Sequence, residues 1–190
     1  MQIRKINIGS ISEEEYSDIS EFFPETAAKV KNCRPDDKKR TLAGRFLLKK
    51  IIKGSYGREN FALSYNKNGK PLLDFCFFNI AHSGDFAVCA VSDSPIGVDI
   101  ECVGRFKKRK KYMLFTALES EYINKEDGES RFYTLWTRKE AYLKAKGGIL
   151  ADAANTELVT PDFKLRDIFD GFRFTTEKTD GYILSTAEKI

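Results

Sequence analysis

The spacing of the apolar residues changes along this chain of 190 residues, and this change limits the folds that it can adopt. The segments 36–52 and 130–146 repeat their apolar residues at helical spacing. Between and after them lie apolar or alternating runs bounded by turn residues, which are typical of strands. These runs are 75–80, 86–91, 96–102 and a terminal hairpin within 163–188. Because helices are separated from runs of strands, we expect an α+β fold.

Turn and cap residues predict where these segments end. Asp36 is a candidate N-cap for the first helix, and Gly54 is a candidate stop. The second helix, the strongest in the chain, should end at the glycines that follow residue 146. Ser94-Pro95 predicts a boundary between two halves, 1–94 and 95–190.

Composition indicates an ordinary globular protein. The 32 Lys and Arg residues against 28 Asp and Glu residues give a net charge of +4, and the mean hydropathy is −0.42. This mild excess of positive charge permits an acidic partner without requiring one. No apolar run approaches the ~20 residues of a membrane span, and the first residues lack the apolar stretch of a secretory signal. We therefore expect a cytoplasmic protein with no membrane partner.

Cysteine and histidine exclude several kinds of site. The four cysteines form no C-x-x-C pair, so we expect buried thiols rather than disulfides. His82 is the only histidine, which excludes zinc sites built on several histidines, and no G-x-S-x-G motif supports a serine hydrolase. Carboxylates and lysines must therefore carry the chemistry of an enzyme of this sequence.

A first candidate motif is Gly97-Val98-Asp99-Ile100-Glu101. Side chains alternate along a strand, so the two acids share one face and lie close enough to bind one divalent cation. Magnesium prefers such oxygen ligands. A half-buried strand with its acids in solvent would have the same pattern.

A second candidate motif lies on the strong helix at 136–144. Glu140 and Lys144 are four residues apart and share a helical face, which a surface ion pair would also explain. Lys139, by contrast, falls within the apolar stripe, where its ammonium must reach solvent or an anion.

Two further segments carry candidate functional residues. The segment 79–84 places His82 and Ser83 at the end of a strand, where their donors suit a phosphate, although a lone histidine more often has a structural role. The basic run at 105–111, which begins with Arg105 and ends with Lys111, suits a solvated helix face or the docking of an acidic partner.

In this order, the motifs resemble those of the 4′-phosphopantetheinyl transferases of the Sfp type. The segment 97–101 is similar to that family's G-[IV]-D-[IV]-E block, and 136–144 is similar to its W-x-x-K-E-[AS]-x-x-K block. The segment 79–84 is similar to its N-x-[SA]-H-S block, and 69–71 matches its G-K-P. Arg40 opens a segment similar to its arginine-bearing first helix.

The resemblance covers about residues 70–149 and implies a fold and an activity. The fold would be two similar α+β halves related by a pseudo-twofold axis, each a small antiparallel sheet packed with helices. The active site would lie in the cleft between them, and the protein would work as a monomer. The activity would be the transfer of 4′-phosphopantetheine from coenzyme A to a serine hydroxyl of an apo acyl or peptidyl carrier protein, releasing adenosine 3′,5′-bisphosphate.

The resemblance also assigns roles to the charged residues of the two main motifs. Asp99, Glu101 and Glu140 would bind magnesium, or manganese in its place, and the metal would bridge the coenzyme A pyrophosphate. Asp99 and Lys144 therefore count among the coenzyme A-binding residues, with Lys144 on the phosphates. Glu140 would also take the proton of the serine, directly or through water.

The remaining assignments concern the nucleotide and the partner. Arg40, Lys70 and His82, with Ser83 beside it, would bind the adenosine 3′-phosphate and nearby phosphates. Lys29 and Lys31 are looser candidates for the same role. Carrier proteins are acidic, so the basic run at 105–111 would steer one towards the site, and no nucleic acid is expected.

Two departures from the family pattern keep alternatives open. Ala81 stands where the family often has serine, and Gly147-Gly148-Ile149 stands where Gly-x-Gly-Leu is usual. The chain could instead be an inactive relative that binds coenzyme A without transferring from it. A second alternative is a basic nucleic-acid-binding module that uses the run at 105–111.

Overall fold

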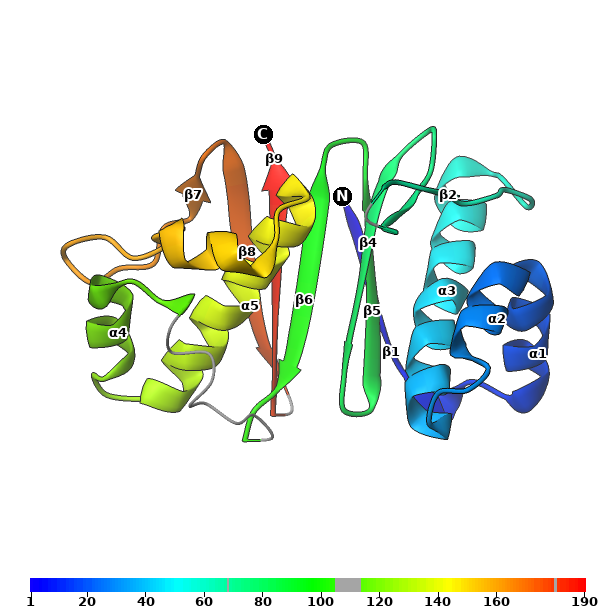
Figure 1. Cartoon of the computed structure of the whole chain (residues 1–190), viewed down its shortest axis with the longest axis horizontal. Coiled ribbons are helices and arrows are strands. Elements are labelled where there is room, and N and C mark those ends of the chain that lie inside the picture. Colours follow the sequence, from blue (N-terminus) through cyan, green and yellow to red (C-terminus); the bar gives the residue numbers. More distant parts are fainter. Residues whose placement is uncertain (68, 105–113, 180) are drawn as a thin grey trace. The chain divides into compact units, whose positions relative to one another are not determined.

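The structure is a computed structural model that describes residues 1–67, 69–104, 114–179 and 181–190. The chain divides into two units, Met1–Asp93 and Ser94–Ile190. Each unit combines an antiparallel sheet with helices, which confirms the predicted α+β class (Figure 1). Within the described ranges, no helix has the length and apolar composition needed to cross a membrane.

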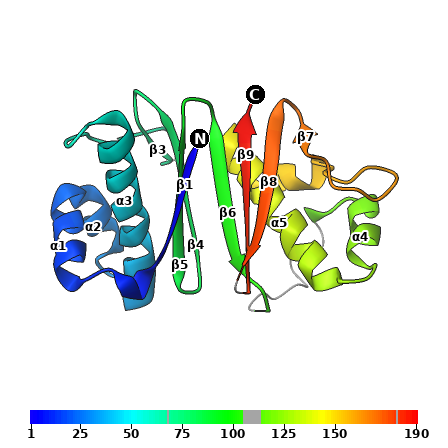
Figure 2. The ribbon, with the colours of Figure 1, turned by 180° about the vertical axis from the view of Figure 1, so that it is seen from behind.

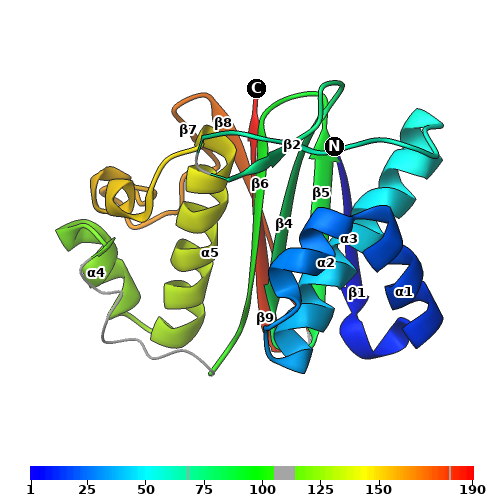
Figure 3. The ribbon, with the colours of Figure 1, turned by 45° about the vertical axis from the view of Figure 1, so that its right-hand side comes forward.

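The first unit is a three-stranded sheet covered by a long helix. Its strand order is β1-β5-β4. A separate short hairpin, formed by β2 and β3, precedes β4 in the sequence. The helix α3 packs on all three strands, and α1 and α2 pack against α3 (Figure 3). The elements are β1 (Gln2–Asn7), η1 (Ile8–Ser10), α1 (Glu13–Phe22), α2 (Pro24–Val30), α3 (Pro35–Tyr56), β2 (Ser64–Tyr65), β3 (Pro71–Leu72), β4 (Phe77–Ser83) and β5 (Phe86–Ser92).

The predicted first helix is longer than its sequence signals indicate. It begins at Pro35, after the N-cap Arg34, so the prediction of Asp36 as the N-cap is wrong. A proline at the first helical position lacks only an N–H that the helix would leave unpaired. The helix continues through Gly54 and ends at Gly57, whose φ of 63° is the left-handed conformation that glycine adopts without strain. The prediction of Gly54 as the stop is therefore wrong.

The second unit is a four-stranded antiparallel sheet with a buried helix against it. Figure 2 shows β6, β9 and β8 side by side, in the order β6-β9-β8-β7, with α5 behind them. The predicted strand 96–102 and the terminal hairpin are confirmed, and the chain end β9 separates β6 from β8. The elements are β6 (Ile96–Cys102), α4 (Ala117–Ile123), α5 (Gly128–Lys146), η4 (Leu150–Asn155), β7 (Ile168–Phe169), β8 (Phe172–Thr179) and β9 (Tyr182–Lys189).

The cysteines agree in part with the prediction of buried thiols. Cys76 and Cys89 are buried, Cys102 is partly exposed and Cys33 is exposed, so the prediction is wrong for Cys33. None of the four, which all lie in the described part of the chain, forms a disulfide. Burial raises the pKa of the Cys76 thiol to about 11, so Cys76 is protonated and unreactive near neutral pH.

Candidate active site

A glycine brings the strand β6 and the helix α5 into close contact. A Cβ atom on Gly97 would lie 1.9 Å from the carbonyl oxygen of Ala141 and 2.7 Å from the backbone nitrogen of Ala145. Ala141 directly follows Glu140, and Ala145 directly follows Lys144; Glu140 and Lys144 are the predicted functional residues of α5. The missing side chain at Gly97 therefore lets the helix lie directly on the strand, with Glu140 and Lys144 next to the contact in the sequence.

Lys144 and Asp99 join these two elements through an ion pair. The Nζ of Lys144 lies 2.6 Å from the Oδ1 of Asp99 and 3.3 Å from the carbonyl oxygen of Val98. Asp99 is 7% exposed, whereas the side chain of Lys144 keeps 29% of its surface exposed. The alternative of a strand with both acids in solvent is therefore wrong, because Asp99 faces the helix.

The two other predicted carboxylates also act on Lys144. Burial alone would lower the pKa of Lys144, but the charge of Asp99 and its hydrogen bond, followed by the charges of Glu140 and Glu101, outweigh burial and raise this pKa. All three acids of the two motifs thus favour the charged form of one ammonium group. Lys144 remains a cation at neutral pH.

Trp136 connects the start of the helical motif to the strand. Its Nε1 donates to the Oε1 of Glu101 at 3.2 Å, and the indole is 1% exposed. A buried indole N–H needs an acceptor, and this bond holds the Glu101 carboxylate against α5. The sequence gave no sign of this hydrogen bond.

The donor set suits a hard divalent cation, although the side chains do not form a ready metal centre. Among the described residues, no three His, Cys, Asp or Glu side chains are grouped closely enough to hold a metal ion. Asp99, Glu101 and Glu140 nevertheless act together on one cation, the ammonium of Lys144. Carboxylate oxygens are the ligands that magnesium prefers.

The buried lysine of the apolar stripe finds its anion on α4. Lys139 and Glu119 are both 0% exposed, and the Nζ of Lys139 lies 2.5 Å from the Oε2 of Glu119. The ammonium also donates to the carbonyl oxygens of Ala153 at 2.7 Å and Leu114 at 2.9 Å. The prediction that Lys139 must reach solvent or an anion is confirmed, and the partner is an anion.

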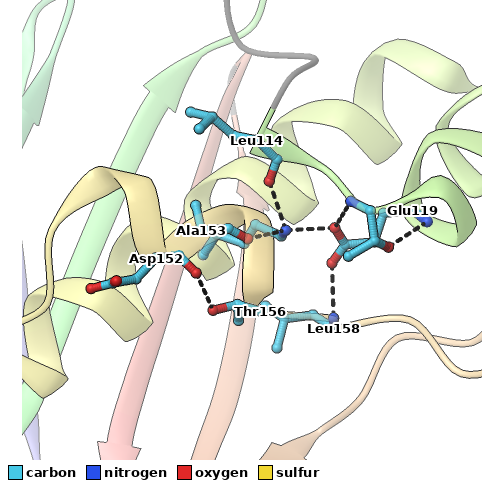
Figure 4. A network of polar contacts seen from close by, with 8 residues as sticks. Leu114, Glu119, Asp152, Ala153, Thr156 and Leu158 are labelled. Carbon is cyan, nitrogen blue, oxygen red and sulfur yellow. Dashed lines mark hydrogen bonds and ion pairs between the residues drawn. The ribbon is translucent and has the colours of Figure 1, made fainter.

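Glu119 is held by backbone donors as well as by this lysine. Its Oε1 accepts from the backbone N–H of Leu158 at 2.8 Å, and its Oε2 accepts from that of Thr116 at 3.0 Å (Figure 4). The pair thus ties α5 to α4 and to the segment that follows η4. Glu140 comes directly after Lys139, so this buried network fixes the turn of α5 that carries it.

Of the residues expected to bind the nucleotide, Lys70 and His82 line one pocket of the first unit. The pocket has a volume of about 200 Å³. The other lining residues are Thr41, Arg45, Pro71, Phe78, Asn79 and Ile80. Lys70 is half-buried, and this burial lowers the pKa of its ammonium.

The remaining nucleotide candidates lie outside this lining. Arg40 donates to the carbonyl oxygen of Gly84 at 2.9 Å and to the Oδ1 of Asp37 at 2.7 Å. Ser83 ends β4 next to His82. The ammonium of Lys29 lies 4.0 Å from the centre of the Tyr65 ring. Lys31 lines a different pocket, beside α1.

The two departures from the family pattern have local structural roles. Ala81 is buried at 5% exposure, on the face of β4 opposite to Phe78 and Ile80, which pack on α3. Gly147 caps α5 with a φ of 75°, and the N–H groups of Gly147 and Gly148 both donate to the carbonyl oxygen of Leu143. The helix therefore ends in a glycine cap. The basic run at 105–111 lies outside the described residues.

Three contributors to these sites were missed in the sequence. The close approach at Gly97 follows from the packing of two distant segments. Glu119 carries one signal, the T-x-x-E capping box that it forms with Thr116, but this pattern marks a helix start and not a partner for Lys139. Arg45 carries no such signal, because its place beside Lys70 and His82 depends on how the fold brings α3 and β4 together.

Residues 95–186 match a family model described as the 4′-phosphopantetheinyl transferase superfamily. The matched segment contains β6 and α5 with all three carboxylates and Lys144. Through this unit the chain belongs to that superfamily, as its motifs predicted.

Curated relatives carry the same family name. The chain is 36% identical over 126 residues to the 4′-phosphopantetheinyl transferase gsp of Aneurinibacillus migulanus, covering 62% of this chain and 52% of that protein. It is 32% identical over 149 residues to the 4′-phosphopantetheinyl transferase Sfp of Bacillus subtilis strain 168, covering 72% and 66%. It is 34% identical over 147 residues to the 4′-phosphopantetheinyl transferase HetI of a Nostoc species, covering 67% and 60%. The alignments thus span between about half and two thirds of these relatives.

Proposed function

We propose that this protein transfers 4′-phosphopantetheine from coenzyme A to a serine hydroxyl of an apo carrier protein in a magnesium-dependent reaction. The observation that carries this proposal is the 2.6 Å ion pair of Asp99 with Lys144, whose charged form Glu140 and Glu101 also favour, within the residues that match the superfamily. Phosphoryl transfer requires positive charges close to the phosphate oxygens and a base that takes the proton of the nucleophile. Lys144 would supply a positive charge, and Glu140 would supply the base.

Asp99, Glu101 and Glu140 would hold the metal ion, with manganese as an alternative to magnesium. The bound ion would neutralise charge on the pyrophosphate of coenzyme A and allow three neighbouring carboxylates to stay ionised. The hydrogen bond from Trp136 keeps Glu101 against the helix, and the contact at Gly97 keeps Asp99 beside it. The protein thus positions its acids by packing β6 on α5.

Glu140 and Lys144 would act on the reacting groups. Glu140 accepts the proton of the carrier serine, directly or through water, while the serine oxygen bonds to the phosphorus of the phosphopantetheine group. The bond from that phosphorus to the adenosine 3′,5′-bisphosphate breaks, and the bisphosphate leaves with the bonding electrons. Lys144 stays protonated because the acids around it raise its pKa, so it can stabilise the charge on the phosphates.

The first unit would bind the nucleotide end of coenzyme A. Lys70 and His82 line the pocket of about 200 Å³, and Arg40 and Ser83 belong to the elements that border it, α3 and β4. Cations with poor access to water suit a phosphate ligand. We assign the adenosine 3′-phosphate to these residues.

The partner is an acyl or peptidyl carrier protein. Carrier proteins of this kind are acidic, and the basic run at 105–111 offers the opposite charge. We propose that the protein acts as a monomer in the cytoplasm, where thiols such as Cys76 and Cys89 stay reduced.

Mass measurement of the carrier tests this proposal. The protein is incubated with coenzyme A, magnesium and apo carriers from fatty-acid, polyketide and non-ribosomal peptide synthesis. We expect at least one carrier to gain one phosphopantetheine, and the same carrier with its serine replaced by alanine to gain none. If coenzyme A binds but no carrier gains mass, the protein is an inactive relative. Salt-sensitive binding of DNA or RNA without binding of coenzyme A would identify a nucleic-acid-binding module instead.

A further inference from the structure

The pocket of about 200 Å³ in the first unit has a strongly cationic lining. Arg45, Lys70 and His82 contribute basic groups to it, and among the described residues no Asp or Glu lines it. Thr41 and Asn79 add side chains that can donate hydrogen bonds. A small pocket with this lining suits an anion with several oxygens.

The cation that α3 contributes to this lining is Arg45 and not Arg40. Arg40 binds the Oδ1 of Asp37 at 2.7 Å and the carbonyl oxygen of Gly84 at 2.9 Å, and it is absent from the lining. Arg45 lies one turn after Thr41, which also lines the pocket. The two arginines of this helix therefore have different surroundings.

Arg45 is held in place by contacts to α2. Its Nε donates to the Oγ1 of Thr26 at 3.1 Å, and its guanidinium carbon lies 5.8 Å from the centre of the Phe23 ring. Thr26 is buried at 3% exposure, so this hydrogen bond has little competition from water. A guanidinium fixed in this way loses little freedom when it binds a ligand.

The burial of two cations in one lining favours an anionic ligand. Burial lowers the pKa of Arg45, and the opposing effects of Tyr65 and Glu25 do not cancel it. Burial also lowers the pKa of Lys70. Both residues are half-buried cations in one lining, and a phosphate dianion would compensate for the water that they have lost.

We propose that Arg45 is a further nucleotide-binding residue, which contacts the 3′-phosphate of the adenosine and selects ligands that carry it. This inference rests on the proposed function, in which Asp99, Glu101, Glu140 and Lys144 serve the pyrophosphate. The 3′-phosphate is the other charged group of coenzyme A, and the cations of the first unit are left to bind it.

The test compares adenosine 3′,5′-bisphosphate with adenosine 5′-monophosphate, which lacks the 3′-phosphate, by calorimetric titration of the full chain. Arg45→Gln should weaken binding of the bisphosphate by about ten- to hundredfold and that of the monophosphate by less than about threefold. In the transfer assay, the preference for coenzyme A over 3′-dephospho-coenzyme A should fall through KM, with kcat unchanged. Arg58→Gln is the matched control, because Arg58 also lies over an aromatic ring, 4.0 Å from the centre of Phe75, but outside this pocket.

Arg45→Lys keeps the charge and tests the inference even if Arg45→Gln folds poorly. Because lysine lacks the planar fork of donors, this variant should show an intermediate preference for the bisphosphate. An undiminished preference in Arg45→Lys, or an equal loss for both nucleotides in Arg45→Gln, would overturn the inference. If the unaltered protein binds neither coenzyme A nor the bisphosphate, the proposed function itself fails. If it transfers normally and only the preference is insensitive to Arg45, this inference alone fails.

Discussion

The ammonium of Lys144 lies 2.6 Å from the Oδ1 of Asp99, which joins a helix to a strand that is 45 residues away in the sequence. The negative charges of Glu140 and Glu101 also raise the pKa of this ammonium, so three acids favour its charged form. In our account the same acids bind the magnesium ion of the reaction. Lys144 then competes with the metal for Asp99 in the protein without substrates.

Replacing Lys144 by methionine should make the stability of the protein depend more strongly on magnesium. Without the ammonium the three carboxylates repel one another, and a bound divalent cation offsets this repulsion. We expect magnesium to raise the thermal midpoint of Lys144→Met by several degrees more than that of the unaltered protein, at about 2–4 °C for each kcal/mol. Lys146→Met is the control, since Lys146 pairs with Asp170 instead. Equal magnesium effects in all three proteins would argue against a metal at these acids.

Replacing Gly97 by alanine should separate α5 from β6. The new Cβ would lie 1.9 Å from the carbonyl oxygen of Ala141, so the backbone must move. We expect a loss of about 1–3 kcal/mol in the free energy of unfolding, measured with urea, together with a fall in transfer activity. Gly54→Ala is the matched control, because no atom lies within 4 Å of its added Cβ and alanine favours a helix. A Gly97→Ala protein as stable and active as the Gly54→Ala protein would contradict the close contact.

The buried pair of Lys139 and Glu119 should behave as a unit. Lys139→Met leaves the Glu119 carboxylate buried without its cation, and we expect a loss of about 3–5 kcal/mol in the free energy of unfolding. Adding Glu119→Gln removes that charge and keeps one side-chain oxygen, which can accept from the N–H of Leu158 or from that of Thr116. The double variant should therefore be more stable than Lys139→Met alone. Strictly additive losses in denaturant unfolding would show that the two side chains are not coupled.

Neutralising the basic run should weaken recognition of the carrier and not of coenzyme A. With Lys107, Lys108, Lys110 and Lys111 changed to glutamine, we expect KM for the carrier to rise about tenfold at low salt, because steering of the acidic carrier is lost. KM for coenzyme A should stay within about twofold. The control is a variant in which Lys49, Lys50 and Lys53 of α3 are changed to glutamine, because it removes positive charge outside the basic run. An equal rise in both KM values would remove the docking role.

The second unit could largely be predicted from the sequence because its signals are local. The strand 96–102 was bounded by Ser94-Pro95, and the strong helix was closed by the glycine that does cap it at 147. Both predicted ends of the first helix are wrong. At its C-terminal end, a single glycine such as Gly54 destabilises a helix by only about 1 kcal/mol and does not end it. The three-residue difference between Gly54 and Gly57 depended on which glycine takes a positive φ.

The sequence motifs predicted the acids of the candidate site, but they did not indicate the residues that support those acids. Asp99, Glu101, Glu140 and Lys144 could be found because strand and helix periodicity placed them in pairs within two short motifs. Glu119 and Arg45 could not be assigned roles in this way, because each depends on a partner that the fold brings close from far along the chain, or on a pocket between separate elements. The N-terminal strand β1 and the helices α1 and α2 were not expected as elements, since their apolar residues are few.

The central claim, that three acids serve a magnesium-dependent transfer, is tested most directly by the release of adenosine 3′,5′-bisphosphate during carrier modification. The release is measured while magnesium is titrated into metal-free protein, for the unaltered chain and for Asp99→Asn, Glu101→Gln and Glu140→Gln, with Asp162→Asn as the control for an exposed acid. We predict no release without metal, saturable release with magnesium, and a loss of about a hundredfold or more in each of the three site variants but not in the control. Release that proceeds fully in a chelator, or that all three site variants retain, would contradict the account.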